Sequence, residues 1–232
     1  MSSLVSLRVA DSASTWERLG FVVDADGAVV ISGVRFRFET EDGEHGPGTG
    51  AGKGLTGWTL HDPAGVLPDN IDGISTTTVA THDPVAVHAT NGSHPNGVTG
   101  IDHLVLRTPN LERTIATFER LGFPCRRRRD AHTQGSTVTQ QAFFWLGSPD
   151  DPNDRVVLEV VGTSVVDPDK IDAPSSFFGI ALVCDDLDAT AAFFGDLVKP
   201  PIDAVQRGRR ITAISARGGS TVPIALMTPH VK

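Results

Sequence analysis

The chain has few cysteines, no excess of positive charge and no long apolar run, and each lack excludes a class of protein. Only two cysteines, Cys125 and Cys184, occur in 232 residues, which excludes a small scaffold held together by disulfides. No apolar run approaches the roughly 20 residues that a membrane-spanning helix needs. The first residues also lack the basic and apolar regions of a secretion signal. We therefore expect a cytoplasmic protein with no membrane partner.

The charge balance argues against a nucleic-acid partner. The net charge is −8, with 28 acidic and 20 basic side chains, whereas binding to nucleic acid depends on neutralising phosphates. One local exception is the run of four arginines at 126–129. It is either a solvated strand edge, or a strand in which Arg127 and Arg129 point into a pocket and hold an anionic group.

A strand, a polar turn and an amphipathic helix occur together three times in the sequence. Residues 100–123 align without a gap with residues 176–199, and residues 15–21 (TWERLGF) nearly repeat residues 117–123 (TFERLGF). The strand and helix motifs lie about three residues closer together in the first copy, which predicts a helix about one turn shorter. The repeats indicate one structural unit used several times.

The helix of the middle copy has clear boundaries. Leu111, Ile115 and Phe118 have the spacing that builds one apolar helical face. Asn110 precedes them as an N-cap, and Gly122 follows as a stop signal. Strand-like runs come after each helix, so each unit is predicted to be a β-α-β-β-β module.

These modules divide the chain into four parts and predict an α+β fold. We expect a degenerate N-terminal module at 1–40 and a glycine-rich connection at 41–97 with a possible extra strand at 54–60. The middle module spans 98–165, and the C-terminal module at 166–232 pairs with it.

Two polar residues interrupt strands of the middle module that otherwise look buried. His103 lies in VTGIDHLVLR (98–107), and Glu159 lies in RVVLEVVG (155–162). A buried imidazole or carboxylate needs a hydrogen-bond partner, an opposite charge or a metal. Each could be a satisfied core residue, but two such residues at matching places favour a polar pair that lines a cavity.

The strand QQAFFWL (140–146) supplies a candidate wall for that cavity. Alternation places Gln141, Phe143 and Trp145 on one face of the strand. These aromatic rings are either plain core or the surface that holds a flat or apolar part of a ligand. In the second case, Arg127 or Arg129 would meet the charge of the ligand.

The β-α-β-β-β units, opened by GIDHLVLRTPNLERTIATFERLGF and closed by VVLEVVG, resemble the vicinal oxygen chelate superfamily of glyoxalases, extradiol dioxygenases and bleomycin-resistance proteins. The resemblance implies that paired modules curve their mixed sheets around a shared cavity. It also implies a divalent metal (Zn, Fe, Mn or Ni) held by residues of the first and last strands of each module. In the middle module these are His103 and Glu159.

This sequence departs from the full ligand pattern that the resemblance implies. The C-terminal module has Gly179 and Ala225 at the matching positions, and the N-terminal module has Leu4 and Arg37. A third ligand would come from His132, Gln140, Gln141 or a second chain. Two ligands alone would hold a divalent ion weakly.

The resemblance leaves two main functions open. The first is a metal-assisted lyase, isomerase or dioxygenase that acts on an oxygen-rich metabolite, with His103 and Glu159 as metal ligands or as general acid and base. The second is a non-enzymatic protein that sequesters a planar small molecule, as bleomycin-resistance proteins do. A scaffold in which the polar pair is only structural is a third possibility. Because modules work in pairs and three is odd, the N-terminal module suggests a homodimer.

Overall fold

The computed structural model describes residues 2–40, 53–81, 94–134, 137–148, 150 and 155–230. The chain forms two compact units. Unit 1 comprises Met1–Val5, Gly57–His82 and His103–Phe178, and unit 2 comprises Ser6–Thr56, Asp83–Asp102 and Gly179–Lys232. Both contain mixed sheets and short helices, which confirms the predicted α+β class.

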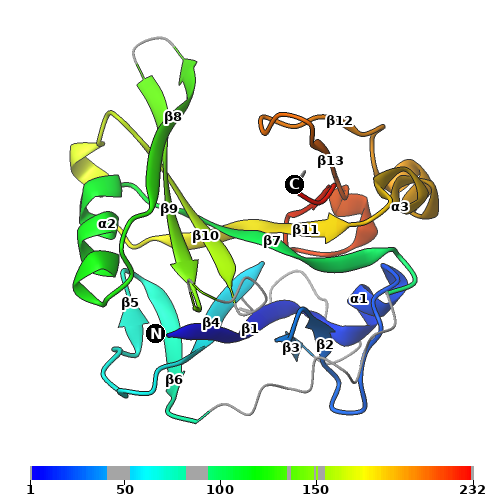
Figure 1. Ribbon diagram of the computed structural model, residues 1–232, viewed down its shortest axis with the longest axis horizontal. Helices are drawn as coiled ribbons and strands as arrows, with labels where there is room; N and C mark the ends of the chain where they lie inside the picture. The colour runs from blue at the N-terminus through cyan, green and yellow to red at the C-terminus, as the bar shows by residue number, and fades with distance from the viewer. Residues whose placement is uncertain are drawn as a thin grey trace. The chain divides into compact units, whose positions relative to one another are not determined.

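Unit 1 contains a three-stranded and a four-stranded arrangement. The first has the order β4-β6-β5, from β4 (Leu55–His61), β5 (Asn70–Ile71) and β6 (Ile74–Val79). The second has the order β7-β10-β9-β8 (Figure 1). Its elements are β7 (Val98–Arg107), α2 (Leu111–Arg120), β8 (Arg127–Gln134), β9 (Thr137–Leu146) and β10 (Val156–Thr163), followed by the short helix η2 (Pro168–Lys170).

Unit 2 repeats this plan, with shorter elements in its four-stranded part. The order β2-β3-β1 is built from β1 (Ser3–Ser12), α1 (Ala13–Arg18), β2 (Val29–Ile31) and β3 (Val34–Thr40). The order β12-β13-β14-β11 is built from β11 (Ser176–Cys184), α3 (Leu187–Phe194), η3 (Gly195–Leu197), β12 (Ile202–Asp203), β13 (Arg210–Ala213), η4 (Ala216–Gly218) and β14 (Ile224–Met227). Strands β1, β4, β7 and β11 contribute residues to both units.

Within the described residues, four chain segments rather than the expected three show the same strand pairing. In each, the first strand runs parallel to the last, and the last is antiparallel to the one before it: β1 with β3 and β2, β4 with β6 and β5, β7 with β10 and β9, and β11 with β14 and β13. The described part of the predicted connection at 41–97 therefore holds a helix-free copy of the module. Unit 1 pairs this copy with the middle module.

The sequence does not indicate the fourth copy, because this segment is rich in polar residues. The structure places β4 at the expected strand, but β6 is the threonine-rich segment ISTTTV, which is typical of a linker. Thr76 of β6 is buried, and its hydroxyl is satisfied there by a hydrogen bond of 2.7 Å that it accepts from Trp58 Nε1. The homodimer was expected because three modules would leave one unpaired. Four modules can pair within one chain, so this argument for a homodimer no longer holds.

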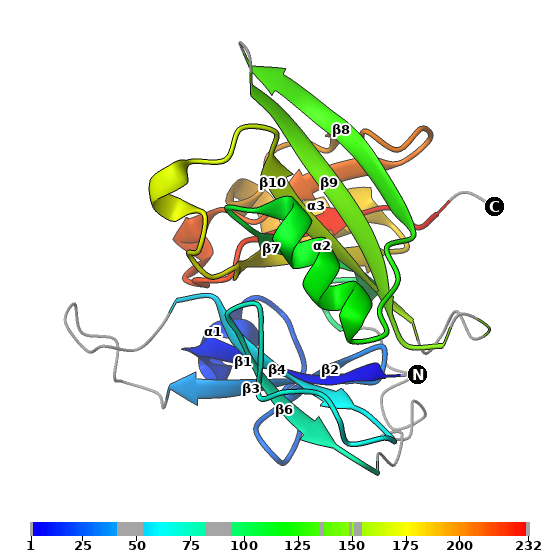
Figure 2. The ribbon, with the colours of Figure 1, turned by 90° about the vertical axis from the view of Figure 1, so that its left-hand side faces the viewer.

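The middle module packs as its sequence predicts. The side chain of Asn110 caps α2 by accepting a hydrogen bond from Arg113 N at 3.1 Å. Gly122 follows α2 with φ 85°, a value that glycine adopts without strain. Phe118 of α2 lies 5.1 Å from the ring of Phe144 on β9 and 6.2 Å from that of Trp58 on β4. Helix α2 thus covers the Phe144 face of the β9–β10 pair (Figure 2) and leaves the opposite face of these strands to other groups.

Helix α1 has six residues against ten in α2, in agreement with the predicted shorter first helix. Its Trp16 is buried and donates from Nε1 to Asp11 Oδ2 at 2.9 Å. Ser220 Oγ and Thr221 Oγ1 also donate to the Asp11 carboxylate, at 2.7 and 2.6 Å. This carboxylate has no exposed surface, and its donors join the N-terminal and C-terminal modules of unit 2.

In the described residues, every helix is too short or too polar to cross a bilayer.

Candidate functional site

The face of unit 1 that lies opposite α2 gathers the predicted site residues in rows across neighbouring strands. His103 on β7, Val157 on β10 and Trp145 on β9 form one row. The next row holds Val105, Glu159, Phe143 and Arg127, and the third holds Arg107, Val161, Gln141 and Arg129. All seven residues predicted for the site therefore share one face.

His103 and Glu159 approach each other on the diagonal between two rows. The Nε2 atom of His103 lies 3.5 Å from Oε2 of Glu159, and their side chains are 16% and 11% exposed. These fractions place both groups at the border of the core, where water reaches them but does not fully solvate them. Water competes less with a polar contact at such a place than at the open surface.

Gln141 fixes the second oxygen of Glu159. Its Nε2 donates a hydrogen bond to Glu159 Oε1, while its own Oε1 accepts one from Arg129 Nε. A guanidinium can only donate and a carboxylate can only accept, so these two neighbours leave the amide one orientation. The result is a continuous chain from Arg129 through Gln141 and Glu159 to His103.

The aromatic rings of this face are in contact with arginine side chains. The guanidinium of Arg126 lies 4.6 Å from the ring centroid of Trp145, and that of Arg155 lies 4.2 Å from it. Arg129 lies 5.4 Å from the ring of Phe143. Cation–π contacts of this kind hold guanidinium groups in place. The predicted aromatic wall is thus a surface that carries positive charge.

A further contact of this kind lies at the end of β7. The guanidinium of Arg107 is 3.5 Å from the ring centroid of Phe178. Neither residue is among those predicted for the site, and Arg126 and Arg155 are not predicted as ring partners. Alternation along β7 would have placed Arg107 on the His103 face, but nothing in the sequence indicates its contact with Phe178.

The arginine run divides between two faces, as a strand requires. Arg127 and Arg129 share the face of Phe143 and Gln141, while Arg128 makes a bidentate pair with Glu112 of α2. The hydrogen bond with Glu112 is the main reason that the pKa of Arg128 is raised above its ordinary value. Arg128 therefore belongs to the exposed edge of the strand, and the binding of an anionic group by Arg127 and Arg129 stays a prediction.

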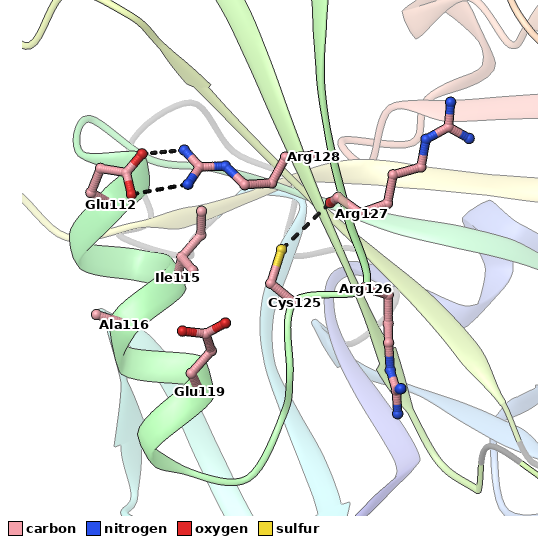
Figure 3. Close-up of a pocket in the computed structure, with 8 residues that line it drawn as sticks. All are labelled: Glu112, Ile115, Ala116, Glu119, Cys125, Arg126, Arg127 and Arg128. Carbon is pink, nitrogen blue, oxygen red and sulfur yellow. Dashed lines mark hydrogen bonds and ion pairs between the residues drawn. The ribbon is translucent and has the colours of Figure 1, made fainter.

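A groove lies between α2 and the segment 125–128 (Figure 3). Its volume is about 530 Å³, and its lining comprises Glu112, Ile115, Ala116, Glu119, Cys125, Arg126, Arg127 and Arg128. The side chains of Arg126 and Arg127 point away from the helix, and the Cys125 thiol donates to the Arg127 carbonyl at 3.5 Å. His103 and Glu159 are not part of this groove.

The donor set around His103 does not fit a resident divalent metal. His103 and Glu159 are suitable ligand types, but Gln141 presents its nitrogen, which is a hydrogen-bond donor, to Glu159. Gln140 points to the other face and donates to Asp130 Oδ1 at 3.1 Å. Within the described ranges, no three His, Cys, Asp or Glu side chains gather as a metal site. The side chain of His132 lies outside the described residues.

The C-terminal module cannot supply the missing histidine for a steric reason. Gly179 occupies the position that matches His103, and a Cβ atom there would lie 2.4 Å from the carbonyl oxygen of Pro223. No side chain fits without moving that backbone. Ala225, which matches Glu159, carries no donor atom.

The pairing pattern and the His103 face together define a glyoxalase-like module. Residues 100–199 match the family model described as Glyoxalase/Bleomycin resistance protein/Dioxygenase superfamily. The match covers less than half of the chain and agrees with the resemblance to the vicinal oxygen chelate superfamily over these residues. None of the curated proteins compared with the chain matches it.

Several solved structures are similar in fold. A methylmalonyl-CoA epimerase from Streptomyces coelicolor is 21% identical with a TM-score of 0.45, and covers 58% of this chain and 99% of its own. The epimerase from Mycobacterium tuberculosis is 18% identical with a TM-score of 0.47, and covers 62% and 97%. A hypothetical protein from Bacillus halodurans is 11% identical with a TM-score of 0.40, and covers 57% and 95%.

Proposed function

We propose that the protein catalyses proton transfer at a carbon atom of a small anionic metabolite, with His103 and Glu159 as the acid–base pair. The reaction class is an isomerase or a lyase. The observation that carries the proposal is the 3.5 Å approach of His103 Nε2 to Glu159 Oε2 on a half-buried face bordered by arginines. Arg127 and Arg129, with Gln141, Phe143 and Trp145, complete the proposed binding surface.

The charges of the face support an anionic ligand. Arg107, Arg127 and Arg129 lie on it, and Glu159 is the acidic residue among its paired rows. Arg129 donates to Gln141, and Arg107 stacks on Phe178. Arg127 is exposed, and no described side chain forms an ion pair with it. A guanidinium of this kind binds carboxylate or phosphate with two hydrogen bonds.

The polar pair can perform the proton transfer without another group. Glu159 takes the proton from a carbon next to a carbonyl, and the electrons of that C–H bond move into the enolate. The His103 imidazole donates a hydrogen bond to the enolate oxygen, and the proton returns to the same or a neighbouring carbon. Such positioned acid–base groups contribute about 10²–10⁴-fold to a rate.

Deuterium exchange tests this chemistry before the substrate is known. The protein is incubated in D₂O with a panel of small carboxylates and phosphorylated carbonyl compounds, and loss of the C–H signal is followed by proton NMR. We expect one chemical class to exchange, and the Glu159→Gln and His103→Gln variants to be at least about 100-fold slower. Gln140→Leu, on the opposite face, is the matched control. A panel that neither exchanges nor binds contradicts the proposal.

The second candidate is a binding protein that sequesters an anionic or planar molecule. It is favoured by the arginines stacked on Trp145 and by the absence of donor groups at Gly179 and Ala225. Binding without deuterium exchange would support this function. In that case Glu159→Gln would change the affinity but no rate.

A further inference from the structure

We propose that Gln141 and Arg129 form a lock that holds the His103–Glu159 pair in a hydrogen-bonded form with low affinity for divalent metals. In this role Gln141 and Arg129 position the Glu159 carboxylate, in addition to their place on the proposed binding surface. The inference concerns the same face as the proposed function, but metal titration tests it without any turnover.

The first contact of the lock is made by Arg129, which determines the orientation of the Gln141 side-chain amide. Arg129 Nε donates to Gln141 Oε1, so the amide nitrogen faces the other way, toward Glu159 Oε1. Reversing the amide would set its NH₂ group against a guanidinium and its oxygen against a carboxylate. Two favourable hydrogen bonds would become two repulsive contacts.

The second step concerns the oxygens of Glu159. Oε1 accepts the Gln141 hydrogen bond, and Oε2 faces His103 Nε2 at 3.5 Å. A metal bound by His103 and Glu159 would have to displace one of these contacts. The metal ion would also be repelled by the positive charge of Arg129, which lies next to Gln141. His103 and Glu159 would be its only two ligands, since a third is missing.

Gln141 is therefore the residue that decides whether the face can hold a metal. Glutamate has the shape of glutamine but replaces the NH₂ donor with an acceptor oxygen. Gln141→Glu would remove the hydrogen bond to Glu159 and place a second carboxylate beside His103 and Glu159. One imidazole and two carboxylates are a ligand set that suits Zn²⁺, Co²⁺ and Mn²⁺.

The neighbouring residue provides a matched control. Gln140 also donates its side-chain nitrogen to a carboxylate, Asp130 Oδ1, but on the opposite face of β9. Gln140→Glu therefore adds the same charge to the same strand without touching His103. Arg127→Met removes a positive charge from the His103 face without breaking the contact between Arg129 and Gln141.

The test is titration with Co²⁺ alone, followed by isothermal calorimetry and by visible absorption. We expect Gln141→Glu to bind one Co²⁺ at least about tenfold more tightly than the unmodified protein. The added affinity should disappear when His103→Ala is combined with it. Arg129→Met, which frees the amide to turn, should also raise the affinity, and more than Arg127→Met does. Thermal melting checks that each variant folds, and Arg129→Met decides the matter if Gln141→Glu does not fold.

Three results would overturn the lock. The unmodified protein would bind Co²⁺ through His103 as tightly as Gln141→Glu does. Gln140→Glu would raise the affinity as much as Gln141→Glu, which would show a general effect of charge. Or neither Gln141→Glu nor Arg129→Met would raise it. Failure of the deuterium-exchange test, in contrast, would leave these metal affinities unchanged.

Discussion

Glu159 Oε2 lies 3.5 Å from His103 Nε2, and the two residues stand on adjacent parallel strands that open and close one module. Glu159 is paired with Val105, two residues along β7 from His103, so the side chains of His103 and Glu159 share one face and meet on the diagonal. The pair is thus a product of the module's register, and any insertion of one residue in β7 or β10 would separate it.

Arg127 is expected to contribute to ligand affinity and not to the chemical step. Arg127→Ala should weaken the binding of an exchanging anion by at least about tenfold, since a hydrogen bond to a charged group contributes about 1.5–3 kcal/mol. The exchange rate at saturation should be nearly unchanged. Arg128→Ala is the control, because Arg128 is turned toward Glu112. Equal losses in the two variants would mean that the arginine run acts only by its overall charge.

Asp72 is expected to be an important ion-pair residue for the stability of unit 1. Its side chain is 7% exposed and accepts from Arg113 Nε at 2.9 Å and from Ser175 Oγ at 2.6 Å. Asp72→Asn preserves a residue type that tolerates its φ of 51° but removes the charge. We expect a loss of about 1–3 kcal/mol in the free energy of unfolding, measured with urea.

The exposed pair of Glu112 and Arg128 provides the contrast to Asp72. Its side chains are 69% and 48% exposed, so Glu112→Gln should change the free energy of unfolding by less than about 1 kcal/mol. If Asp72→Asn costs no more than Glu112→Gln, the role given to Asp72 is wrong.

The two cysteines should react very differently. Cys184 is buried, and burial raises the pKa of its thiol to about 11. Cys125 is only half-buried at the edge of the groove beside α2. The thiolate is the reactive form, so the folded protein should consume one equivalent of an aromatic disulfide reagent at pH 8, and two after unfolding. Cys125→Ser should consume none while folded. Rapid reaction of that variant would contradict the burial of Cys184.

Because of Asp62, the free energy of unfolding should fall in acid. Burial acts to raise its pKa, but hydrogen bonds from the amides of Val66, Ala64 and Leu67 and from Ser2 outweigh this and lower the pKa below 3.8. A folded-state pKa below the unfolded one stabilises the protein above about pH 4 and loses this effect as the pH falls. Urea unfolding between pH 5 and pH 3 should therefore show a steeper decline for the unmodified protein than for Asp62→Asn. Equal declines would contradict this role.

The sequence predicts the middle module well because its signals are local. The N-cap Asn110, the apolar face of α2 and the alternation of β9 each depend on residues a few positions apart. The common face of His103, Glu159, Gln141 and Arg129 follows from the same alternation once the strands are paired. In contrast, the helix-free module at β4–β6 is not predicted, because the buried Thr76 of its threonine-rich strand is satisfied by Trp58, which lies 18 residues away in the chain.

The details of the site could not be predicted because they depend on contacts between strands. Alternation shows that Gln141 and Glu159 could share a face, but not that an amide nitrogen rather than an oxygen would meet the carboxylate. That choice depends on Arg129, which belongs to another strand. In the same way, the arginines that stack on Trp145 come from segments before β8 and before β10. Sequence alone gives no register between such segments.

The central claim is that ligands bind at the His103–Glu159 pair. Its most direct measurement is a two-dimensional NMR spectrum of the histidine rings, recorded while the panel of anions is added. An anion whose carbon exchanges deuterium should shift the His103 resonances and leave those of His61 and His94 in place, and Arg127→Ala should weaken the shift. If such an anion shifts other histidines and leaves His103 unchanged, the site lies elsewhere in the chain.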